Sequence, residues 1–408
     1  MATNALHGMR VVDLSHVIAG PTASHYLALE GAEVIKVEHP AKGDILRGGA
    51  RDLLEPGMPV GFAAINGGKQ SLAMDLTVPR AQELLAALVA TADVFIENFR
   101  PGAVARLGFD YARVRAIKPD IVYASISGFG QEGRWGRRAA YDHVVQAATG
   151  MTMMQGSADQ DPVKVGFPVV DTATGMVASQ AIMAALIRRL RQGVGAYLDI
   201  SMAQAALQLM WPDASRAGVS GRDAPRVGNR GFSGSPGAAC FRCIDGWIAT
   251  AANTQAQFRA LCATVGLADL PDDPSLIDQA ALAQGGFLVA QDAARIQSLL
   301  ETAFASRNAV ELEAQLAALD VPCAKLRQLS EVLREAADGS LMTLPLRKTS
   351  YAGGTLIDFG AGYKADHDSG TALAAAPRLG QHTGVLLASL GVGSDELAAL
   401  TAAGTIRC

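Results

Sequence analysis

The sequence has little of what marks secreted, membrane or nucleic-acid-binding proteins. No run of about eighteen uncharged apolar residues occurs, and Met1–Arg10 has no apolar signal core, so neither a spanning helix nor a leader is expected. A net charge of −4 argues against the concentrated basic surface that phosphate backbones require. We therefore expect a cytoplasmic protein without nucleic-acid or membrane partners. The cysteines are too few and scattered for a disulfide framework, and are expected as reduced thiols: Cys240, Cys243, Cys262, Cys323 and Cys408.

Several catalytic and metal-binding motifs are also missing. HExxH and GxSxG do not occur, and the histidines are scattered singly. Cys240 and Cys243 have CxxC spacing, but no second pair exists, and on a strand they point to opposite faces. Asn66–Lys69 resembles a phosphate loop but lacks its first glycine. We expect no bound metal and no nucleoside triphosphate site.

The first half of the chain alternates between short apolar runs and helical patterns. Such alternation predicts a parallel sheet covered by helices on both faces. The predicted strands are Val11–Leu14, Val34–Val37, Val94–Glu97, Ile121–Ser125 and Gly195–Ile200, and the predicted helices are Pro21–Leu29, Pro79–Ala92, Tyr111–Lys118 and Ser201–Met210.

A long helix is predicted over Thr172–Arg191, with Asp171 as its N-cap and Gly193 just past its end. A boundary is placed at 215–237, where Gly, Ser, Pro and Arg replace apolar periodicity. A hairpin over 239–250 and helices over 256–265 and 296–304 follow, then short strand-like pieces after Glu331 and a helical tail from Gly384.

Taken in order, several runs resemble the class III CoA-transferase (CaiB/BaiF) family, which includes formyl-CoA and carnitine CoA-transferases. Each run alone is weak, but their order and spacing extend over nearly the whole chain. The matching segments are 11–21, 29–38, Gly43-Asp44 with Arg47, 66–76, 93–102, 106–108, 125–130, 171–175, 184–189, 199–202, 321–323 and 378–383.

The resemblance implies an α/β fold in which two chains interlock as a homodimer. Each chain would have a large Rossmann-like CoA-binding domain built from residues 1–220 and 331–408. A small α+β domain would occupy residues 221–330. This small domain agrees with the boundary placed at 215–237.

The resemblance also implies that Asp171 is the nucleophile that moves CoA from an acyl-CoA to a carboxylic acid. A carboxylate can attack a thioester to form a mixed anhydride, and the freed thiolate can return to give an aspartyl-CoA thioester. Without the resemblance, Asp171 is more simply a helix cap. In either role we expect backbone N–H groups at the helix start to hold it ionised.

By the same positional match, one set of residues would contact CoA, which is the only cofactor-like group expected. Arg100 and Arg106 would meet phosphates, because a guanidinium can bind phosphate oxygens in a bidentate way. The alternative for either arginine is a solvated charge on the surface. The implied CoA contacts are His16, Val17, Ile18, Ala19, His39, Met74, Asp75, Leu76, Thr77, Asn98, Phe99, Arg100, Arg106, Ala139, Tyr141 and Asp142.

Departures from the family bear on the acid. Formyl-CoA transferase has a gating glutamine where this chain has Ile18, and basic residues where it has His39 and Ala139, so formate and oxalate chemistry is not expected. We favour a short dicarboxylate with succinyl-CoA as a possible donor, or transfer within one C4 or C5 diacid.

Two alternatives remain open. An α-methylacyl-CoA racemase needs an acid/base pair, and its histidine would stand where this chain has Tyr141, a poor base near neutral pH. His143 lies two residues further on. The second alternative is a CoA-binding protein without catalysis, in which Asp171 only caps its helix.

Overall fold

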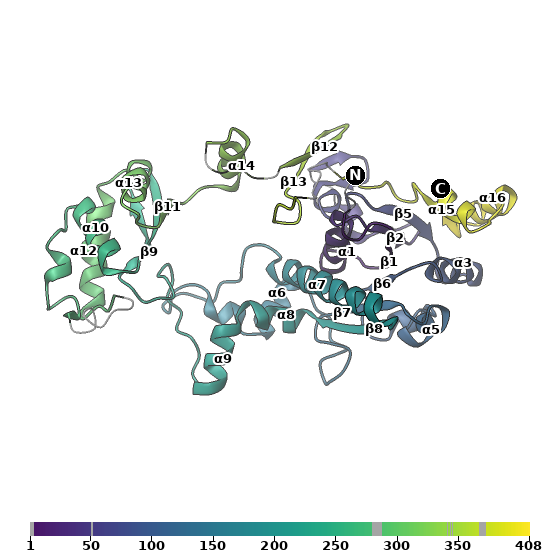
Figure 1. Ribbon diagram of the computed structural model, residues 1–408, viewed down its shortest axis with the longest axis horizontal. Helices are drawn as coiled ribbons and strands as arrows, with labels where there is room; N and C mark the ends of the chain where they lie inside the picture. Colours follow the sequence, from purple (N-terminus) through teal and green to yellow (C-terminus); the bar gives the residue numbers. More distant parts are fainter. Residues whose placement is uncertain are drawn as a thin grey trace. The chain divides into compact units, whose positions relative to one another are not determined.

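The computed structural model describes residues 4–49, 52–279, 288–340, 342, 344, 346–366 and 373–408 (Figure 1). The chain divides into two compact units. Unit 1 contains Met1–Thr152, Lys164–Asp223 and Leu344–Cys408, and unit 2 contains Met153–Val163 and Ala224–Thr343. The domain limits of 1–220, 221–330 and 331–408 stay a prediction, and residues 280–287 of the middle segment lie outside the described residues.

Unit 1 is built on a seven-stranded sheet with the order β14-β5-β2-β1-β6-β7-β8. All neighbouring strands pair in parallel except β14, which runs antiparallel to β5. The mixed α/β class with a mainly parallel sheet is therefore confirmed. The strands are β1 (Arg10–Asp13), β2 (Glu33–Glu38), β5 (Gln70–Met74), β6 (Val94–Glu97), β7 (Val122–Ser127), β8 (Ala196–Ser201) and β14 (Ile406–Arg407).

Both faces of this sheet are covered by apolar cores. Successive side chains of a strand point to opposite faces, so neighbouring residues belong to different cores. Val11 of β1 belongs to a core shared with α1 (Ala19–Leu29) and α7 (Val169–Gln192). Val12 belongs to the other core. That second core is covered by α3 (Pro79–Val89), α5 (Tyr111–Ile117), α15 (Thr383–Ser389) and α16 (Ser394–Ala402).

Helix α7 packs against α1 (Figure 1). A Cβ on Gly175 would lie 2.6 Å from the Thr22 Cβ, so only glycine permits this close approach. The helix ends at Gly193, whose φ of 70° is left-handed, and Arg189 in its last turn forms ion pairs with Asp93 and Asp120. Among the described helices, α7 alone is long and apolar enough by length and composition to span a membrane, and 50% of that stretch is buried, as in a core helix.

The remaining elements of unit 1 are short. The C-terminal tail was expected to be helical only, but it ends in strand β14. A strand of two residues is too short to show a periodic pattern in the sequence. Helix α9 extends into the first part of the 215–237 segment, where the sequence shows no apolar periodicity. The elements are η1 (Ile45–Gly48), β3 (Leu53–Glu55), β4 (Met58–Pro59), α2 (Val60–Ala63), α4 (Ala103–Arg106), α6 (Asp142–Ala148), α8 (Met202–Leu209), α9 (Trp211–Ser220), β12 (Arg347–Tyr351) and β13 (Gly354–Asp358); η2 (Met151–Met154) runs from unit 1 into unit 2.

Unit 2 packs helices against a three-stranded antiparallel sheet with the order β11-β10-β9. On β9, Cys243 is buried in the core while Cys240 is only partly buried, because the two residues lie on opposite faces as expected. The short strands expected after Glu331 are found as β12 and β13, although α14 covers Glu331 itself. The elements are β9 (Gly237–Cys243), β10 (Gly246–Ala252), α10 (Gln255–Val265), η3 (Leu270–Asp272), α12 (Ala293–Ala305), α13 (Ala309–Ala317), β11 (Cys323–Lys325) and α14 (Leu329–Ala337).

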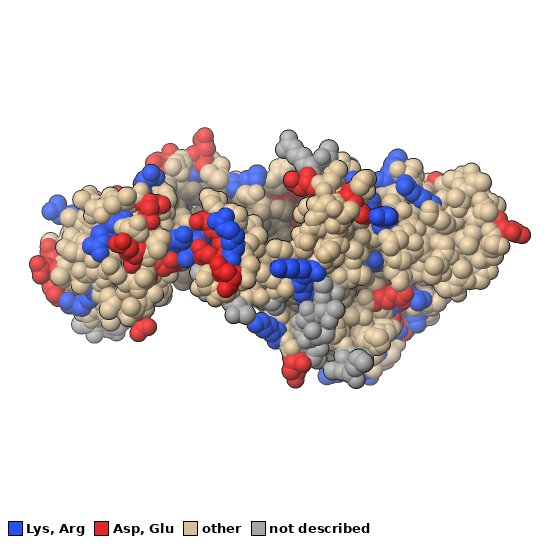
Figure 2. Space-filling view, turned by 90° about the horizontal axis from the view of Figure 1, so that it is seen from above, with Lys and Arg blue, Asp and Glu red and all other residues tan. Residues whose placement is uncertain are grey.

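Charged residues of both signs are interspersed on the face of the molecule shown in Figure 2. On the face shown in Figure 2, the described Lys and Arg residues alternate with Asp and Glu and form no continuous basic area. An anionic ligand must therefore be recognised by local groups.

Candidate active site

The strand order of unit 1 places a binding crevice at one point of the sheet. The chain proceeds from β1 outward through β2 and β5 on one side, and through β6, β7 and β8 on the other. Ligands of open α/β sheets bind beyond the carboxyl ends of the strands at such a reversal. A cavity of about 270 Å³ lies there, lined by His16, Val17, Ile18, Ala19, Asn98, Phe99, Arg100, Pro101, Ile126, Ser127, Gly128, Arg138, Ala140, Tyr141, Asp171 and Met202.

The loop after β1 is held to the loop after β6 by a reciprocal pair of hydrogen bonds. The His16 N–H donates to the Asn98 Oδ1 at 2.8 Å, and the Asn98 amide donates back to the His16 carbonyl at 2.7 Å. Val17 has a φ of 69°, a left-handed conformation that a β-branched residue rarely adopts. The Val17 N–H donates to the Asp44 Oδ1 at 3.2 Å. This hydrogen bond helps to hold Val17 in its strained left-handed conformation at the cavity wall.

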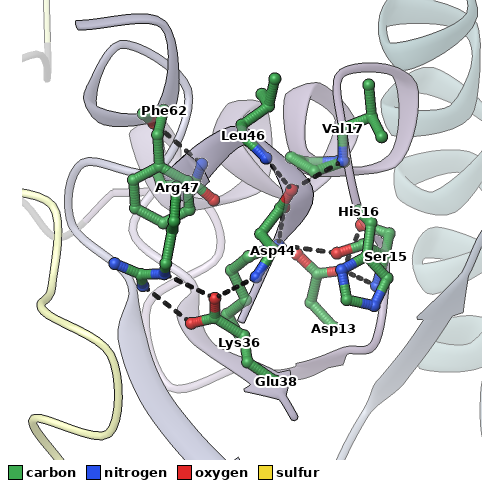
Figure 3. Close-up of polar contacts among 12 residues, drawn as sticks. Asp13, Ser15, His16, Val17, Lys36, Glu38, Asp44, Leu46, Arg47 and Phe62 are labelled. Carbon is green, nitrogen blue, oxygen red and sulfur yellow. Dashed lines mark hydrogen bonds and ion pairs between the residues drawn. The ribbon is translucent and has the colours of Figure 1, made fainter. Parts of the chain in front are cut away.

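Asp44 belongs to a buried network of alternating charges beneath this loop (Figure 3). The Lys36 ammonium lies 2.9 Å from the Asp44 Oδ2, and Arg47 forms an ion pair with Glu38 at 2.7 Å. Burial alone would lower the pKa of Lys36, but the carboxylates of Asp44 and Asp13 raise it above its ordinary value. Lys36 therefore stays charged and anchors the loop that carries Val17.

Lys69, from the sequence that resembles a phosphate loop, points into the same buried region. Its ammonium donates to the Pro21 carbonyl at 2.8 Å and to the Ser24 Oγ at 2.7 Å. Burial lowers its pKa to about 7, although nearby Asp13 opposes the shift. Lys69 does not line the cavity, and its contacts show a structural role.

Helix α1 starts at the cavity with open backbone donors. Its N-cap residue, Ile18, makes no side-chain cap hydrogen bond, and Ile18 and Ala19 both line the cavity. The first N–H groups of a helix have no partner within the helix and favour an anionic group. This helix start is suited to bind a developing oxyanion.

Asp171 lies in the first turn of α7 and is not its N-cap, which corrects the sequence-based assignment. The helix begins at Val169, with Pro168 as N-cap, and two N–H groups of its first turn donate to the Asp142 carboxylate. The Asp142 Oδ2 accepts from the N–H groups of Val170 at 2.7 Å and Asp171 at 3.0 Å. A carboxylate from 29 residues upstream thus performs the capping expected of Asp171.

The expected ionisation of Asp171 is also corrected. Burial raises its pKa to about 7, and the negative charge of Asp142 adds to the increase. The backbone N–H groups expected to stabilise the charge of Asp171 donate to the Asp142 carboxylate instead. A carboxylate with a raised pKa is more basic and therefore a stronger nucleophile once it is ionised.

The structure brings about half of the implied CoA contacts into this cavity. Its walls include His16 to Ala19, Asn98, Phe99, Arg100 and Tyr141, together with Asp171. Burial, followed by the charge of Lys36, lowers the pKa of His16, so its ring is neutral near pH 7.

The other implied contacts lie outside the cavity. His39, Met74, Asp75, Leu76 and Thr77 follow β2 and β5 along the same edge of the sheet, where the His39 Nε2 lies 4.0 Å from the Asp75 Oδ2. Arg106, at the end of α4, is exposed and donates to the Gly102 carbonyl, and Ala139 is also exposed. Asp142 is buried in its cap role. Their contact with CoA stays a prediction.

Sequence reasoning missed several cavity residues, most notably Arg138 on the loop between β7 and α6. Gly128 on the same loop would place a Cβ 2.2 Å from the Ala140 Cβ, so this glycine lets the two ends of the loop meet. Arg138 lies in an arginine-rich stretch, 134–138, which was the only available signal.

Comparison with known proteins agrees with this geometry. Residues 6–383 match the model of CoA-transferase family III. The chain belongs to this family. The family match confirms the prediction that the protein is a class III CoA-transferase, an enzyme that acts on CoA thioesters.

Relatives in this family carry names that specify different acids. A succinate–glutarate CoA-transferase of Agrobacterium fabrum is 37% identical over 66% of this chain and 68% of its own length. A formyl-CoA:oxalate CoA-transferase of Streptomyces avermitilis is 33% identical over 99% of this chain and 100% of its own length.

Solved structures of the family share the fold. A CAIB/BAIF family protein from Brucella suis superimposes with a TM-score of 0.81 at 28% identity, covering 95% of this chain and all of that one. A hypothetical protein from Mycobacterium tuberculosis gives a TM-score of 0.77 at 29% identity, again over 95% of this chain and 100% of that one.

Proposed function

We propose that this family III member moves CoA from an acyl-CoA to a short dicarboxylic acid through covalent intermediates on Asp171. One observation carries the proposal. Among the described residues that line the cavity at the crevice of the sheet, Asp171 is the only acidic one. Succinyl-CoA is the donor we favour.

Each step exchanges one acyl bond for another. The Asp171 carboxylate attacks the thioester carbonyl and releases CoA thiolate, which leaves a mixed anhydride. The thiolate then attacks the aspartyl carbonyl of this anhydride, so the donor acid departs and an aspartyl-CoA thioester remains. The acceptor carboxylate attacks that thioester, and the released thiolate takes the acceptor acyl group and frees Asp171.

The surroundings of Asp171 support these steps. Its raised pKa keeps a basic carboxylate available near neutral pH, and the uncapped start of α1 offers N–H donors to the oxyanion of each attack. The neutral His16 ring adds no positive charge that would pair with Asp171 and weaken its nucleophilicity.

Two features favour transfer over racemisation. Tyr141 lines the cavity where a racemase would have its histidine, and a phenol is a poor base near neutral pH. His143, the substitute candidate, is exposed on α6 and does not line the cavity.

The acid is inferred from the relatives and from one cavity residue. Relatives named succinyl-CoA:glutarate CoA-transferase, such as the mouse protein at 32% identity over 81% of this chain, support a diacid. Ile18 in the cavity wall offers no polar side chain to formate or oxalate. Transfer within one C4 or C5 diacid would use the same chemistry.

An interlocked homodimer is part of the proposal. Helix α9 of unit 1 has no buried residue, and Trp211 at its start is 67% exposed. Leu207 and Leu209 on the preceding α8 are also exposed. Apolar side chains gathered in this way are typical of an interface between copies of a chain.

Trapping the intermediate tests the function. The protein is incubated with succinyl-CoA and hydroxylamine, and the peptides that contain Asp171 and Asp142 are compared by mass spectrometry. A hydroxamate on Asp171 alone is expected, and Asp171→Asn should abolish it together with transfer. Turnover without modification of Asp171 contradicts the mechanism, and solvent deuterium at the α-carbon without acid exchange supports the racemase.

A further inference from the structure

Two arginines lie in the cavity wall. Within the described part of the chain, no carboxylate forms an ion pair with Arg100 or Arg138, although both line the cavity with Asp171. His16 is neutral. The cavity therefore has more positive than negative charge and favours an anion beyond the one that reacts.

Arg138 is held in place by an aromatic side chain of its own loop. Its guanidinium carbon lies 4.3 Å from the centroid of the Trp135 ring, which in turn packs edge-on against Phe129 at 5.2 Å. The backbone N–H of Arg138 also donates to the Trp135 carbonyl at 2.8 Å. Stacking covers one face of the guanidinium and leaves its N–H edge free for a planar anion such as a carboxylate.

The chain ties Arg138 to the reacting group. Arg138 precedes Asp142 by four residues, which span at most about 14 Å. Asp142 accepts from the Asp171 N–H at 3.0 Å. Arg100 lies on a different loop, two residues after Asn98, whose side chain accepts a hydrogen bond from the His16 N–H.

The size of the cavity limits what Arg138 can contact. Pockets that enclose a drug-sized ligand measure about 300–1,000 Å³, and this cavity measures about 270 Å³. It accommodates a thioester end and a short acid, while the nucleotide part of CoA must lie outside. An anion beside Arg138 within the cavity is therefore part of the acyl group.

We propose that Arg138 is a specificity-determining residue that binds the second carboxylate of the diacid while the first reacts at Asp171. This inference rests on the proposed function and deepens it. Because donor and acceptor acyl groups occupy the same cavity in turn, Arg138 would bind the free carboxylate of succinyl-CoA and that of the accepting diacid.

A pair of thioesters isolates this contact. Succinyl-CoA and butyryl-CoA share their CoA part and chain length, and only the first has a free carboxylate. Arg138→Gln should lower the rate constant of Asp171 hydroxamate formation per unit of succinyl-CoA by about 10- to 100-fold, the loss typical of a charge-assisted hydrogen bond, and leave butyryl-CoA unchanged. Arg138→Lys should lose less, because it keeps the charge but not the planar fork.

Arg137→Gln serves as the matched control, since its side chain is on the same loop but does not line the cavity. It should leave both thioesters unchanged. An equal loss for both thioesters in Arg138→Gln would assign Arg138 to CoA, and no loss for either would make it a solvated surface residue; either result overturns the inference.

Calorimetric binding of glutarate separates this inference from the proposed function. Wild type should bind glutarate, and Arg138→Gln should bind it at least tenfold more weakly, independently of any covalent step. If wild type forms no hydroxamate but still shows this difference, the mechanism at Asp171 is wrong while the carboxylate site stands. If glutarate binds both proteins equally, the carboxylate site is wrong.

Discussion

The Asp142 carboxylate accepts a hydrogen bond from the backbone N–H of Asp171 at 3.0 Å, so Asp142 caps the helix and the Asp171 carboxylate is not needed for that role. The two roles are divided between neighbouring carboxylates. This division makes the ionisation of Asp171 depend on its neighbour.

The first prediction concerns pH. Because Asp171 has a raised pKa of about 7, the fraction of reactive carboxylate falls as the pH drops below that value, and kcat/KM for acyl-CoA should fall with it. Asp142→Asn removes the neighbouring charge and keeps an oxygen for the cap, so this acidic limb should move to lower pH. The pH profile of hydroxamate formation measures the shift.

Asp142→Ala is the structural control for that experiment. It removes the cap, and unfolding in urea should show a loss of about 1 kcal/mol in stability, while Asp142→Asn should lose less. An unmoved acidic limb in Asp142→Asn would show that the charge of Asp142 does not reach Asp171.

The second prediction concerns the buried ion pair beneath Val17. Asp44→Leu leaves the fully buried ammonium of Lys36 without its partner and should lower the free energy of unfolding by about 3–5 kcal/mol. Glu396→Ala breaks an exposed pair with Arg80 and should cost at most about 1 kcal/mol. Similar losses in the two variants would contradict the role given to the network.

The third prediction concerns the contact between α1 and α7. The Cβ of Gly175→Ala would lie 2.9 Å from the Ala19 carbonyl as well as close to Thr22, and the substitution should destabilise the protein by about 1–3 kcal/mol. Gly218→Ala in the exposed α9 meets nothing within 4 Å and should instead stabilise by about 0.5–1 kcal/mol. Thermal or urea unfolding of the two variants gives the comparison.

The fourth prediction concerns Glu97 at the end of β6. Burial raises its pKa from 4.5 to about 7, partly opposed by hydrogen bonds from the Ser125 hydroxyl and the Phe99 N–H. Between these values the folded protein binds the proton that the unfolded chain has lost. This contribution to stability is therefore complete below pH 4.5 and is lost as the pH rises through about 7.

Glu97→Gln lacks this titration but keeps an oxygen that can accept from Ser125. Relative to wild type, its free energy of unfolding should rise by roughly 3 kcal/mol between about pH 4 and about pH 9. Urea unfolding at the two pH values tests this. A difference that does not change with pH would mean that Glu97 titrates normally.

The parallel sheet could be predicted because its strands are short apolar runs between helical patterns. Val94–Glu97 has the predicted limits, and β1 and β2 differ from theirs by one residue at either end. Strand β14 could not be predicted, because two residues show no period and its pairing with β5 joins segments far apart in the sequence.

The site was predicted less completely, because its chemistry depends on partners distant in sequence. The family pattern marks Asp171. The sequence near Asp171 does not indicate that Asp142 accepts the hydrogen bonds at the start of α7, or that the charge of Asp142 adds to the rise in the pKa of Asp171. Lys36 lies within a strand whose other residues are mostly apolar, and only the fold reveals that it is buried against Asp44. In the sequence, Arg138 cannot be distinguished from the neighbouring arginines. Only the structure shows that the loop places it at the cavity.

The location of the cavity also bears on how this family can evolve. Its walls come largely from loops that follow β1, β6 and β7, and the strands beneath are held by their own apolar cores. Mutations in those loops can change the acid that is accepted without disturbing strand pairing. A shared scaffold with replaceable loops explains how proteins that align over nearly their whole length at about 28–33% identity can keep one fold and diverge in substrate.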